Sequence, residues 1–362
     1  MARLARRDVV DPAKIQILHC TQRCVRSAFL CGIDLVTGQS FEHRRGWIRG
    51  RLEFLAGVFG IDCLTYTVLS NHAHVVLRSR PDVVNSWSDE EVARRWLHLH
   101  PKRLRRKRRD EDPDEAHETE INLIVKDSAR LAQLRRRLSD VSWWMSSLAE
   151  NIARRSNAED QCKGRFWQGR FGCQVLLDKA SLLACAMYVD LNPIRAAMAE
   201  TPETSQYTGA KDRIDDLTAR TKRSGLSDYD WEREGSNRHS GWLSPIEANP
   251  RQDGIGPDPD HSGQRSSHKG FLSISLTDYL QLLDWTGRSI RTDKRGSIPK
   301  HLAPILSRLS LDTDRWCKVV TGFGKLFKRA AGSTEHLAEE AQRRGLRWLQ
   351  GPGGQLLSTN ST

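Results

Sequence analysis

Hydrophobic and polar positions alternate in several short stretches of the first 80 residues, and this pattern predicts β-strands. A first strand is expected within residues 14–26 and a second at 29–36. Residues 41–59 have the spacing of an amphipathic helix instead. Two further strands are expected at 61–69 and 72–77. Because only a short polar break separates these two strands, they should form a hairpin.

Helical spacing dominates from there to residue 200. A short helix is expected near 89–98, and one long apolar stripe runs from 131 to 152. A strand at 171–177 precedes an apolar helix at 180–191. Asn192-Pro193 should end that helix, because proline disfavours the helical conformation in the residue before it.

A charged block and a change in residue composition divide the rest of the chain. Residues 102–109 read KRLRRKRR, and acidic residues follow at 110–120. Such blocks are typical of solvated loops, although a contact with a DNA backbone is the alternative. Residues 201–270 are expected to be a largely disordered linker, and 271–350 a small helical domain with its own core. A chain ended near Glu232 or Glu234 should therefore still fold.

Composition narrows the class of protein. The chain has 362 residues, 38% hydrophobic and 28% charged, which excludes a wholly disordered protein. Its net charge is +12, and most of the excess lies in residues 1–200, which contain 33 Lys and Arg but only 25 Asp and Glu. This favours a polyanionic partner such as nucleic acid, or else a basic soluble surface. The sequence shows no apolar run long enough for a membrane helix and no secretory signal, so a cytoplasmic location without a membrane partner is expected.

The eight cysteines have irregular spacing and no CxxC motif, so reduced thiols are expected. A zinc site built from His19, Cys20 and Cys24 is a weak alternative, because no second ligand pair has matching spacing.

Two pairs of residues are candidates for chemistry. His72 and His74 flank Ala73 in a strand, so both imidazoles lie on one face, which we expect to be exposed. A lone His-x-His is more often chance or a core pair than a metal site. Tyr188 and Asn192 lie one helical turn apart and share a face. Two imidazoles and an amide oxygen together would suit Mg²⁺ or Mn²⁺, and a nearby phenolate could attack a phosphodiester.

The segment 164–171, GRFWQGRF, combines arginines with aromatic residues and does not suit a regular element. Arginine can hold phosphate while an aromatic ring stacks on an unpaired base, so Arg165, Trp167 and Arg170 are candidate DNA-binding residues. The alternative is a tight loop whose aromatic rings fill the core.

These motifs carry a family resemblance. The run SNHAHVVL, 70–77, resembles the His-hydrophobic-His (HUH) motif of single-tyrosine transposases. YVDLNPIRA, 188–196, is similar to that family's second motif, and GRFWQGRF resembles a segment that precedes the tyrosine helix. Their order resembles the REP-associated tyrosine transposases, where REP denotes repetitive extragenic palindromes. The resemblance covers about residues 14–200, and the combination is more specific than any one motif.

The resemblance implies an α+β fold, a ferredoxin-like antiparallel sheet with helices, as the catalytic domain at 1–200. It implies a divalent metal held by His72, His74 and Asn192. It implies Tyr188 as the nucleophile of a transposase that cleaves and rejoins single-stranded DNA near a hairpin, through a 5′-phosphotyrosine. The protein would be a monomer or a homodimer.

Two other functions stay open at this stage. One is a hairpin-DNA-binding regulator that has lost its chemistry. A pure binder, however, has no use for His72, His74, Tyr188 and Asn192 together. The other is a metal-dependent hydrolase that activates water, which would leave Tyr188 without a role.

Overall fold

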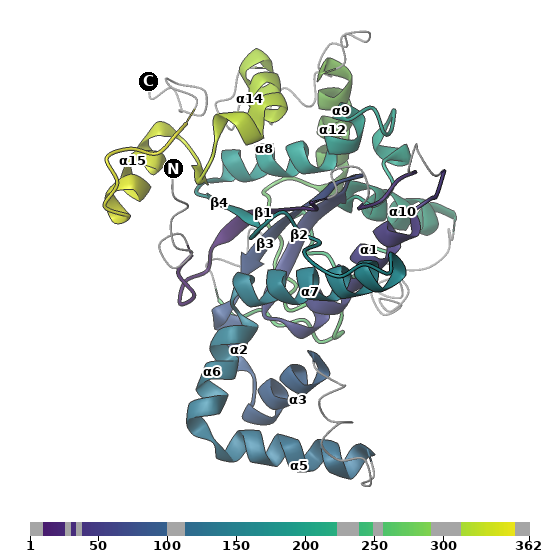
Figure 1. Cartoon of the computed structure of the whole chain (residues 1–362). Coiled ribbons are helices and arrows are strands. Elements are labelled where there is room, and N and C mark those ends of the chain that lie inside the picture. Colours follow the sequence, from purple (N-terminus) through teal and green to yellow (C-terminus); the bar gives the residue numbers. More distant parts are fainter. Residues whose placement is uncertain are drawn as a thin grey trace.

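The computed structural model describes residues 10–25, 30–33, 38–99, 113–222, 239–248, 256–290 and 313–351. It is a mixed α+β structure built on one five-stranded sheet (Figure 1). The strands are β1 (Ile17–Arg23), β2 (Ile61–Val68), β3 (His72–Ser79), β4 (Gly172–Leu176) and β5 (Ala330–Ala331). The helices are α1 (His43–Val58), α2 (Pro81–Ser86), α3 (Asp89–Leu99), α5 (Pro113–Lys126), α6 (Ser128–Leu138), α7 (Val141–Glu159), α8 (Lys179–Asp190), α9 (Asn192–Arg195), α10 (Gly209–Lys222), α12 (Leu276–Ile290), α14 (Thr313–Leu326) and α15 (Thr334–Arg343), with a 3₁₀ turn at Pro202–Thr204.

The sheet has the strand order β2-β3-β1-β4-β5. The first four strands pair antiparallel, and the short β5 joins the edge of β4 in parallel. The expected hairpin is present as β2 and β3, and β1 lies between β3 and β4. In this register Thr21 of β1 pairs with His74 of β3, and His19 pairs with Gln174 of β4.

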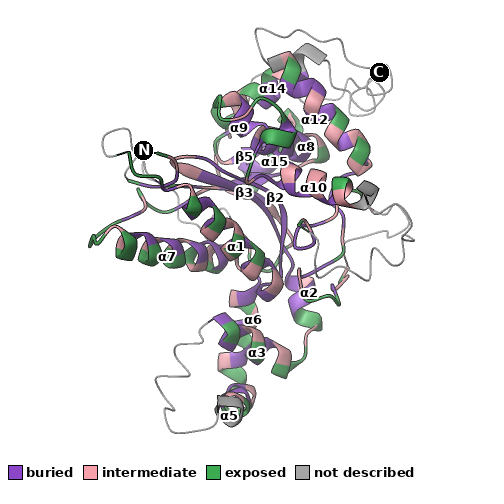
Figure 2. Cartoon of the chain, turned by 90° about the vertical axis from the view of Figure 1, so that its right-hand side faces the viewer, coloured by how far each residue is buried: buried purple, intermediate pink, exposed green. Residues whose placement is uncertain are grey.

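Helices cover both faces of the sheet. Successive side chains of a strand point to opposite faces, and here both sets include apolar residues that need to be covered. Leu18, Val75 and Leu77 are buried in a core shared with α1 and α7. Val76 and Leu176 point the other way, into a second core shared with α8, α12 and α14. Figure 2 shows the sheet buried between the two layers.

The helix α8 lies on the second face and is anchored at both ends. Asp178 caps its first turn, accepting a hydrogen bond from the backbone of Ser181 at 2.7 Å. Near its last turn the buried carboxylate of Asp190 accepts hydrogen bonds from Thr65 of β2 at 2.7 Å and from Tyr279 of α12 at 2.5 Å. These bonds tie α8 to the sheet below it and to α12.

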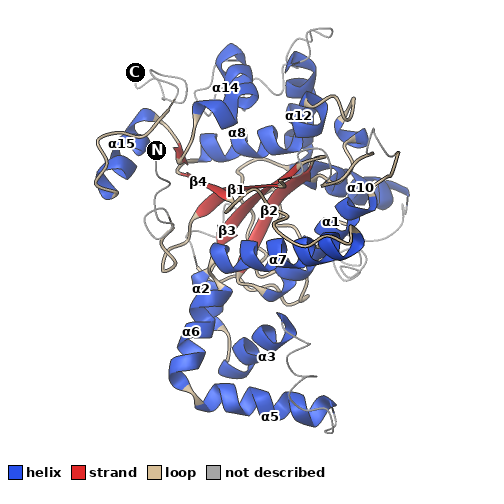
Figure 3. Ribbon diagram, viewed as in Figure 1, coloured by secondary structure: helices blue, strands red, loops and turns tan. Residues whose placement is uncertain are grey.

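A helical lobe extends away from the sheet (Figure 3). It contains α3, α5 and α6, which pack against one another. The expected single helix over 131–152 is two helices, because Asp140 caps a new helix by accepting a hydrogen bond from the backbone of Ser142. Part of the acidic block expected as a loop is helical in α5. The basic stretch 102–109 lies outside the described residues.

The described parts of 201–270 differ from the expected linker. They include α10 and two segments, 239–248 and 256–270, that bond to the sheet. Ser266 and Ser267 each donate a hydrogen bond to the buried carboxylate of Asp62 on β2 at 2.8 Å. Arg78 of β3 donates to the carbonyl oxygen of Lys269 at 2.6 Å. Polar composition suggested disorder, but here the polar groups of the segment pair with buried charges of the sheet.

The helices α12, α14 and α15 follow the expectation of helix in 271–350, but the core that they bury includes residues of the sheet and of α8. Tyr279, Trp316 and Phe323 are fully buried in the cluster that contains Val76 and Met187. The division into domains stays a prediction. The C-terminal helices share one core with the sheet and α8.

One expected strand differs from the structure. Of the stretch 29–36, residues 30–33 are described and form bends with a single bridge from Ile33 to Ser40. The left-handed backbone of Gly32, with φ of +106°, breaks the extended run there. Among the described residues, no helix combines the length and the apolar character needed to cross a membrane.

Candidate functional site

The side chain of Tyr188 lies between α8 and the sheet, among three other rings. Its ring centroid is 5.5 Å from that of His74, edge to face, and 5.9 Å from that of His19. Phe323 of α14 packs against it at 5.7 Å. Tyr188 is half-buried, whereas most other residues of α8 are buried. The sequence-predicted nucleophile and one of the predicted metal ligands are therefore neighbours in the structure.

His72 and His74 lie on the same face of β3, as the period of a strand requires. Their ring centroids are 4.8 Å apart. We expected this face to be exposed, and that was wrong for His74, which retains only 4% of its surface and packs against Tyr188 of α8 and His19 of β1. His72 is half-buried, and its Nδ1 lies 2.5 Å from Oδ1 of Asn71.

A third histidine, His19 of β1, belongs to the same cluster and was missed as part of this site. Its Nε2 lies 2.9 Å from Nδ1 of His74, and its Nδ1 lies 3.4 Å from Oε1 of Gln174. The sequence offered one signal, the alternation in KIQILH, which places His19 and Cys20 on opposite faces. Cys20 is accordingly buried in the other core, so the alternative of a zinc site shared by His19 and Cys20 does not form.

Burial keeps the three imidazoles neutral near pH 7. It lowers the pKa of His72 to about 4, with the positive charge of Arg23 adding to the effect. It also lowers the pKa of His19 to about 4, although the hydrogen bond to Gln174 opposes this. The pKa of His74 is held well below its ordinary value by burial and by the neighbouring His19 and His72. A neutral imidazole keeps a lone pair that can bind a metal ion.

Asn192 follows Tyr188 by one helical turn. The backbone continues as helix across the junction of α8 and α9, since the N–H of Arg195 donates to the carbonyl oxygen of Leu191 at 3.0 Å. The guanidinium of Arg195, two turns beyond Tyr188, lies 4.8 Å from the centre of its ring. Asn192 is therefore on the same side of the helix as Tyr188.

Several buried polar atoms near these residues have no hydrogen-bond partner within the described part of the chain. They are Nε2 of His74, Oγ1 of its β2 neighbour Thr67, Nε2 of Gln174 and Nδ2 of Asn192. Buried polar groups are normally satisfied, so such a set marks a place where a ligand is expected. No group of three or more His, Cys, Asp or Glu side chains in the described ranges is arranged to hold a metal ion. A metal bound here would need the amide of Asn192.

The helix α14 covers the tyrosine from the far side. A Cβ atom added to Gly324 would lie 3.0 Å from the hydroxyl of Tyr188. The guanidinium of Arg195 also donates a hydrogen bond to the carbonyl oxygen of Thr321 at 2.6 Å. The C-terminal region therefore contributes directly to the surroundings of Tyr188, which no local sequence pattern indicated.

Two of the other tyrosines are unsuited to attack. The hydroxyl of Tyr66 donates to Asp212 at 3.0 Å, and that of Tyr279 donates to Asp190. Burial, strengthened by these carboxylates, raises the pKa of each phenol well above its ordinary value. Tyr207 is half-buried, like Tyr188, and Tyr229 lies outside the described residues.

The segment 164–171 runs beside the end of β1, close to His72. Gln168 donates its backbone N–H to the carbonyl oxygen of Arg23, the residue that pairs with His72. Arg165 and Arg170 are exposed. Trp167 is half-buried, and its indole N–H donates to the carbonyl oxygen of Ala149 of α7 at 2.8 Å. The two arginines are thus open to solvent, while the tryptophan is fixed against α7.

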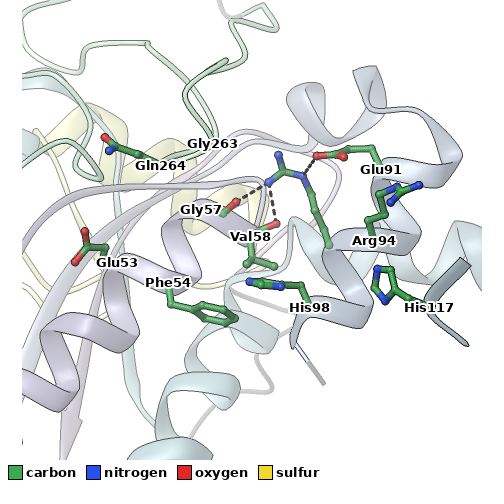
Figure 4. A pocket seen from close by; sticks show the side chains of 11 residues that line it. Glu53, Phe54, Gly57, Val58, Glu91, Arg94, His98, His117, Gly263 and Gln264 are labelled. Carbon is green, nitrogen blue, oxygen red and sulfur yellow. Dashed lines mark hydrogen bonds and ion pairs between the residues drawn. The ribbon is translucent and has the colours of Figure 1, made fainter. Parts of the chain in front are cut away.

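A pocket of about 460 Å³ lies on the other side of the sheet, between α1, α3 and α5 (Figure 4). Its charged groups are largely paired. Arg95 donates to Glu91 at 2.6 Å and to the carbonyl oxygen of Gly57 at 2.7 Å, and Arg94 pairs with Glu118. The ring of His98 stacks on Phe54. This pocket contains none of the predicted site residues.

Comparisons with known proteins give one distant likeness. No family model matches the chain, and no curated protein matches it. A solved structure of a REP-associated tyrosine transposase bound to a REP hairpin aligns with 60% of this chain and 84% of its own, with a TM-score of 0.32 and 11% identity. A TM-score this low does not establish a common fold.

Proposed function

We propose that the protein is a metal-dependent nuclease of the tyrosine transposase type, which cleaves and rejoins single-stranded DNA with Tyr188 as nucleophile. The observation that carries the proposal is the contact between Tyr188 and His74, whose ring centroids are 5.5 Å apart. The tyrosine is on α8 and the histidine on β3, more than 100 residues earlier. Two motifs that resemble one family at the sequence level thus converge in space.

The sheet supports the same assignment. Strands β4-β1-β3-β2 are antiparallel, with α1 between β1 and β2, and α7 between β3 and β4. This is the order of a ferredoxin-like β-α-β-β-α-β unit, the fold that the resemblance implies. The lobe of α3, α5 and α6 and the C-terminal helices would be additions to that unit.

The donor set fits a divalent metal. His72 and His74 would supply neutral imidazoles, and Asn192 an amide oxygen. The buried Nε2 of His74 and the buried amide nitrogen of Asn192 both lack partners in the described chain. An amide can turn about its last bond to present oxygen in place of nitrogen. Bound there, Mg²⁺ or Mn²⁺ would polarise the phosphodiester.

The reaction would exchange one ester for another. The phenolate oxygen of Tyr188, having lost its proton to solvent, would attack phosphorus and form a 5′-phosphotyrosine bond. The bond between phosphorus and the 3′ oxygen would break, and that oxygen would leave as a 3′-hydroxyl after taking up a proton. Attack of a 3′-hydroxyl on the phosphotyrosine would then rejoin the strand and release Tyr188.

Single-stranded DNA beside a hairpin is the proposed substrate. Arg165 and Arg170 are exposed beside the strand that pairs with His72, where they can contact phosphates. Trp167, which is half-buried, is the proposed stacking residue. A perfect duplex should not be cut. The paired strands are too bulky to bring a phosphodiester to Tyr188, which lies half-buried between α8 and the sheet.

The test is the covalent adduct. The full chain is incubated with labelled hairpin oligonucleotides that carry single-stranded flanks, with Mn²⁺, and run on a denaturing gel. Tyr188→Phe should abolish the adduct and leave hairpin binding nearly intact, since only a hydroxyl is lost. Tyr207→Phe is the matched control, because Tyr207 is also half-buried and should not matter. An adduct that survives in Tyr188→Phe would refute the assignment.

A second function, a hairpin-DNA-binding regulator without chemistry, predicts a different result. Such a protein would bind the oligonucleotide but form no adduct in Mn²⁺, and Tyr188→Phe would behave as wild type. The partnerless Nε2 of His74 beneath Tyr188 favours the enzyme, since a binding surface gains nothing from that arrangement.

A further inference from the structure

The contact between His19 and His74 is the least explained feature of the site. The two residues lie on neighbouring strands, diagonal to each other in the register of β1 and β3. The planes of their rings are nearly parallel, inclined by 13°, and the ring centroids are 5.1 Å apart. Nε2 of His19 is 2.9 Å from Nδ1 of His74, a distance typical of a strong hydrogen bond. Both side chains are almost completely buried.

A hydrogen bond between two neutral imidazoles fixes where both protons are. Each ring has one N–H and one lone pair, so only one of the two facing nitrogens carries hydrogen. If Nδ1 of His74 donates, Nε2 of His19 accepts, and the N–H of His19 is at Nδ1, where it faces Oε1 of Gln174 at 3.4 Å. The remaining nitrogen of His74, Nε2, then carries a lone pair.

The reverse arrangement leaves a buried donor unsatisfied. With the proton on Nε2 of His19, its Nδ1 lone pair would face the oxygen of Gln174, also an acceptor, unless the amide of Gln174 turned about its last bond. In either orientation of that amide, the N–H of His74 would be at Nε2, a buried atom without a partner in the described chain. An unpaired buried donor is costly, so the first arrangement is favoured.

We propose that His19 is a positioning residue that holds His74 in the tautomer with its Nε2 lone pair free for the metal. The proposal rests on the proposed function, because the lone pair on Nε2 of His74 has a role only if a metal binds there. Ligating histidines commonly donate their other N–H to a neighbouring acceptor, which fixes the orientation of the ring and raises its basicity. Here the acceptor is a second imidazole, which Gln174 orients in turn. Phe323, with its ring centroid 6.3 Å from that of His19, covers the pair from α14.

The tautomer can be measured without metal or DNA. The full chain is labelled with ¹⁵N-histidine, and long-range ¹H–¹⁵N correlations assign the protonated nitrogen of each ring. His74 should be protonated at Nδ1 and His19 also at Nδ1. Protonation of His74 at Nε2 would overturn the proposal. This measurement uses wild-type protein, so it does not depend on any variant folding.

Two variants test the effect on metal binding. His19→Gln keeps an acceptor near the former Nε2, whereas His19→Leu removes it. With Zn²⁺ as a diamagnetic probe, His19→Leu should raise the dissociation constant about 10- to 100-fold, and His19→Gln should recover part of the loss. Unchanged affinity in a folded His19→Leu would overturn the proposal. A large Zn²⁺-induced shift at the nitrogens of His19 itself would show that it is a ligand, and would overturn it too.

The outcome separates this inference from the proposed function. Failure of wild-type protein to form an adduct with DNA, while the tautomer and the Zn²⁺ affinities behave as described, would refute the nuclease and leave the role of His19 intact. Adduct formation together with unchanged Zn²⁺ affinity in His19→Leu would refute the role of His19 alone.

Discussion

Gly324 of α14 faces the hydroxyl of Tyr188 so closely that an added Cβ atom would lie 3.0 Å from it and 3.6 Å from Cζ of the ring. We expect Gly324→Ala to lower the rate of adduct formation on single-stranded DNA by about tenfold or more. The phenol would have to shift by a few tenths of an ångström, and reaction rates depend steeply on the placement of the attacking atom. The rate is measured as phosphotyrosine adduct against time.

Gly322→Ala is the control for this variant. It lies on the same helix, so both substitutions bring the same gain in helix propensity. An added Cβ at Gly322 meets only the side chain of Leu326, at 3.2 Å. Its rate should stay close to that of wild type. Equal rates in the two variants would mean that α14 does not constrain Tyr188 during the reaction.

We expect His72→Ala and His74→Ala each to reduce adduct formation by about two orders of magnitude or more, because one imidazole and one amide hold a hard cation poorly. EDTA should stop the reaction, and Mg²⁺ or Mn²⁺ should restore it. The exposed His261 provides a control, since His261→Ala removes an imidazole far along the chain from the motif. Full activity of wild-type protein in EDTA would exclude a metal requirement.

Sequence patterns identified the parts of the site whose geometry is local. The relation of His72 to His74 depends on the period of a strand, and that of Tyr188 to Asn192 on the period of a helix, so both could be read from spacing. The hairpin of β2 and β3 was accessible for the same reason. His19 was not, because its proximity to His74 follows from the register between β1 and β3, two strands more than 40 residues apart.

Packing between distant elements explains the other differences. The covering of Tyr188 and His19 depends on Phe323 of α14, and no local pattern encodes the place of that helix. The break at Asp140 went unnoticed because the apolar stripe continues in phase through it, while only a capping side chain marks the new helix. The polar segment 256–270 resembles a linker in composition, yet Asp62 and Arg78 give it partners.

Asp212 should give the protein an unusual pH dependence. Burial raises the pKa of its carboxyl to about 6 from 3.8, although Arg49 and the hydroxyl of Tyr66 oppose this. Between these values the folded chain holds a proton that the unfolded chain has released. The contribution of this group to stability therefore falls as pH rises from about 4 to about 6, and is constant above that range.

The measurement compares the Tm of wild type and Asp212→Asn from pH 4 to pH 8. The asparagine cannot ionise and keeps the shape of the side chain. We expect the wild type to lose Tm relative to the variant as pH rises to about 6, and the difference to stay level beyond. A difference that does not vary with pH would show that Asp212 titrates alike in the folded and unfolded chains.

The last prediction concerns a chain that lacks the C-terminal helices, for which sequence and structure predict opposite results. Composition suggested that a chain ended near Glu232 or Glu234 folds and cleaves DNA. In the structure such a chain would lack Tyr279, which bonds to Asp190 of α8, and the buried Trp316 and Phe323. Loss of large buried aromatic side chains costs about 3–5 kcal/mol each when they are truncated singly. We therefore expect the shortened chain to be insoluble or to unfold at a much lower temperature.

Limited proteolysis of the full chain provides the complementary measurement. Cuts in the described segment 256–276 should be slow, because its serines and carbonyl groups bond to Asp62 and Arg78. A chain ended after residue 351 is the control for truncation, since it keeps α12, α14 and α15 and should retain the Tm of wild type. A soluble chain ended at Glu234 that still forms the adduct would mean that the sheet and α8 need no cover from α14, and would establish the C-terminal region as a separate domain.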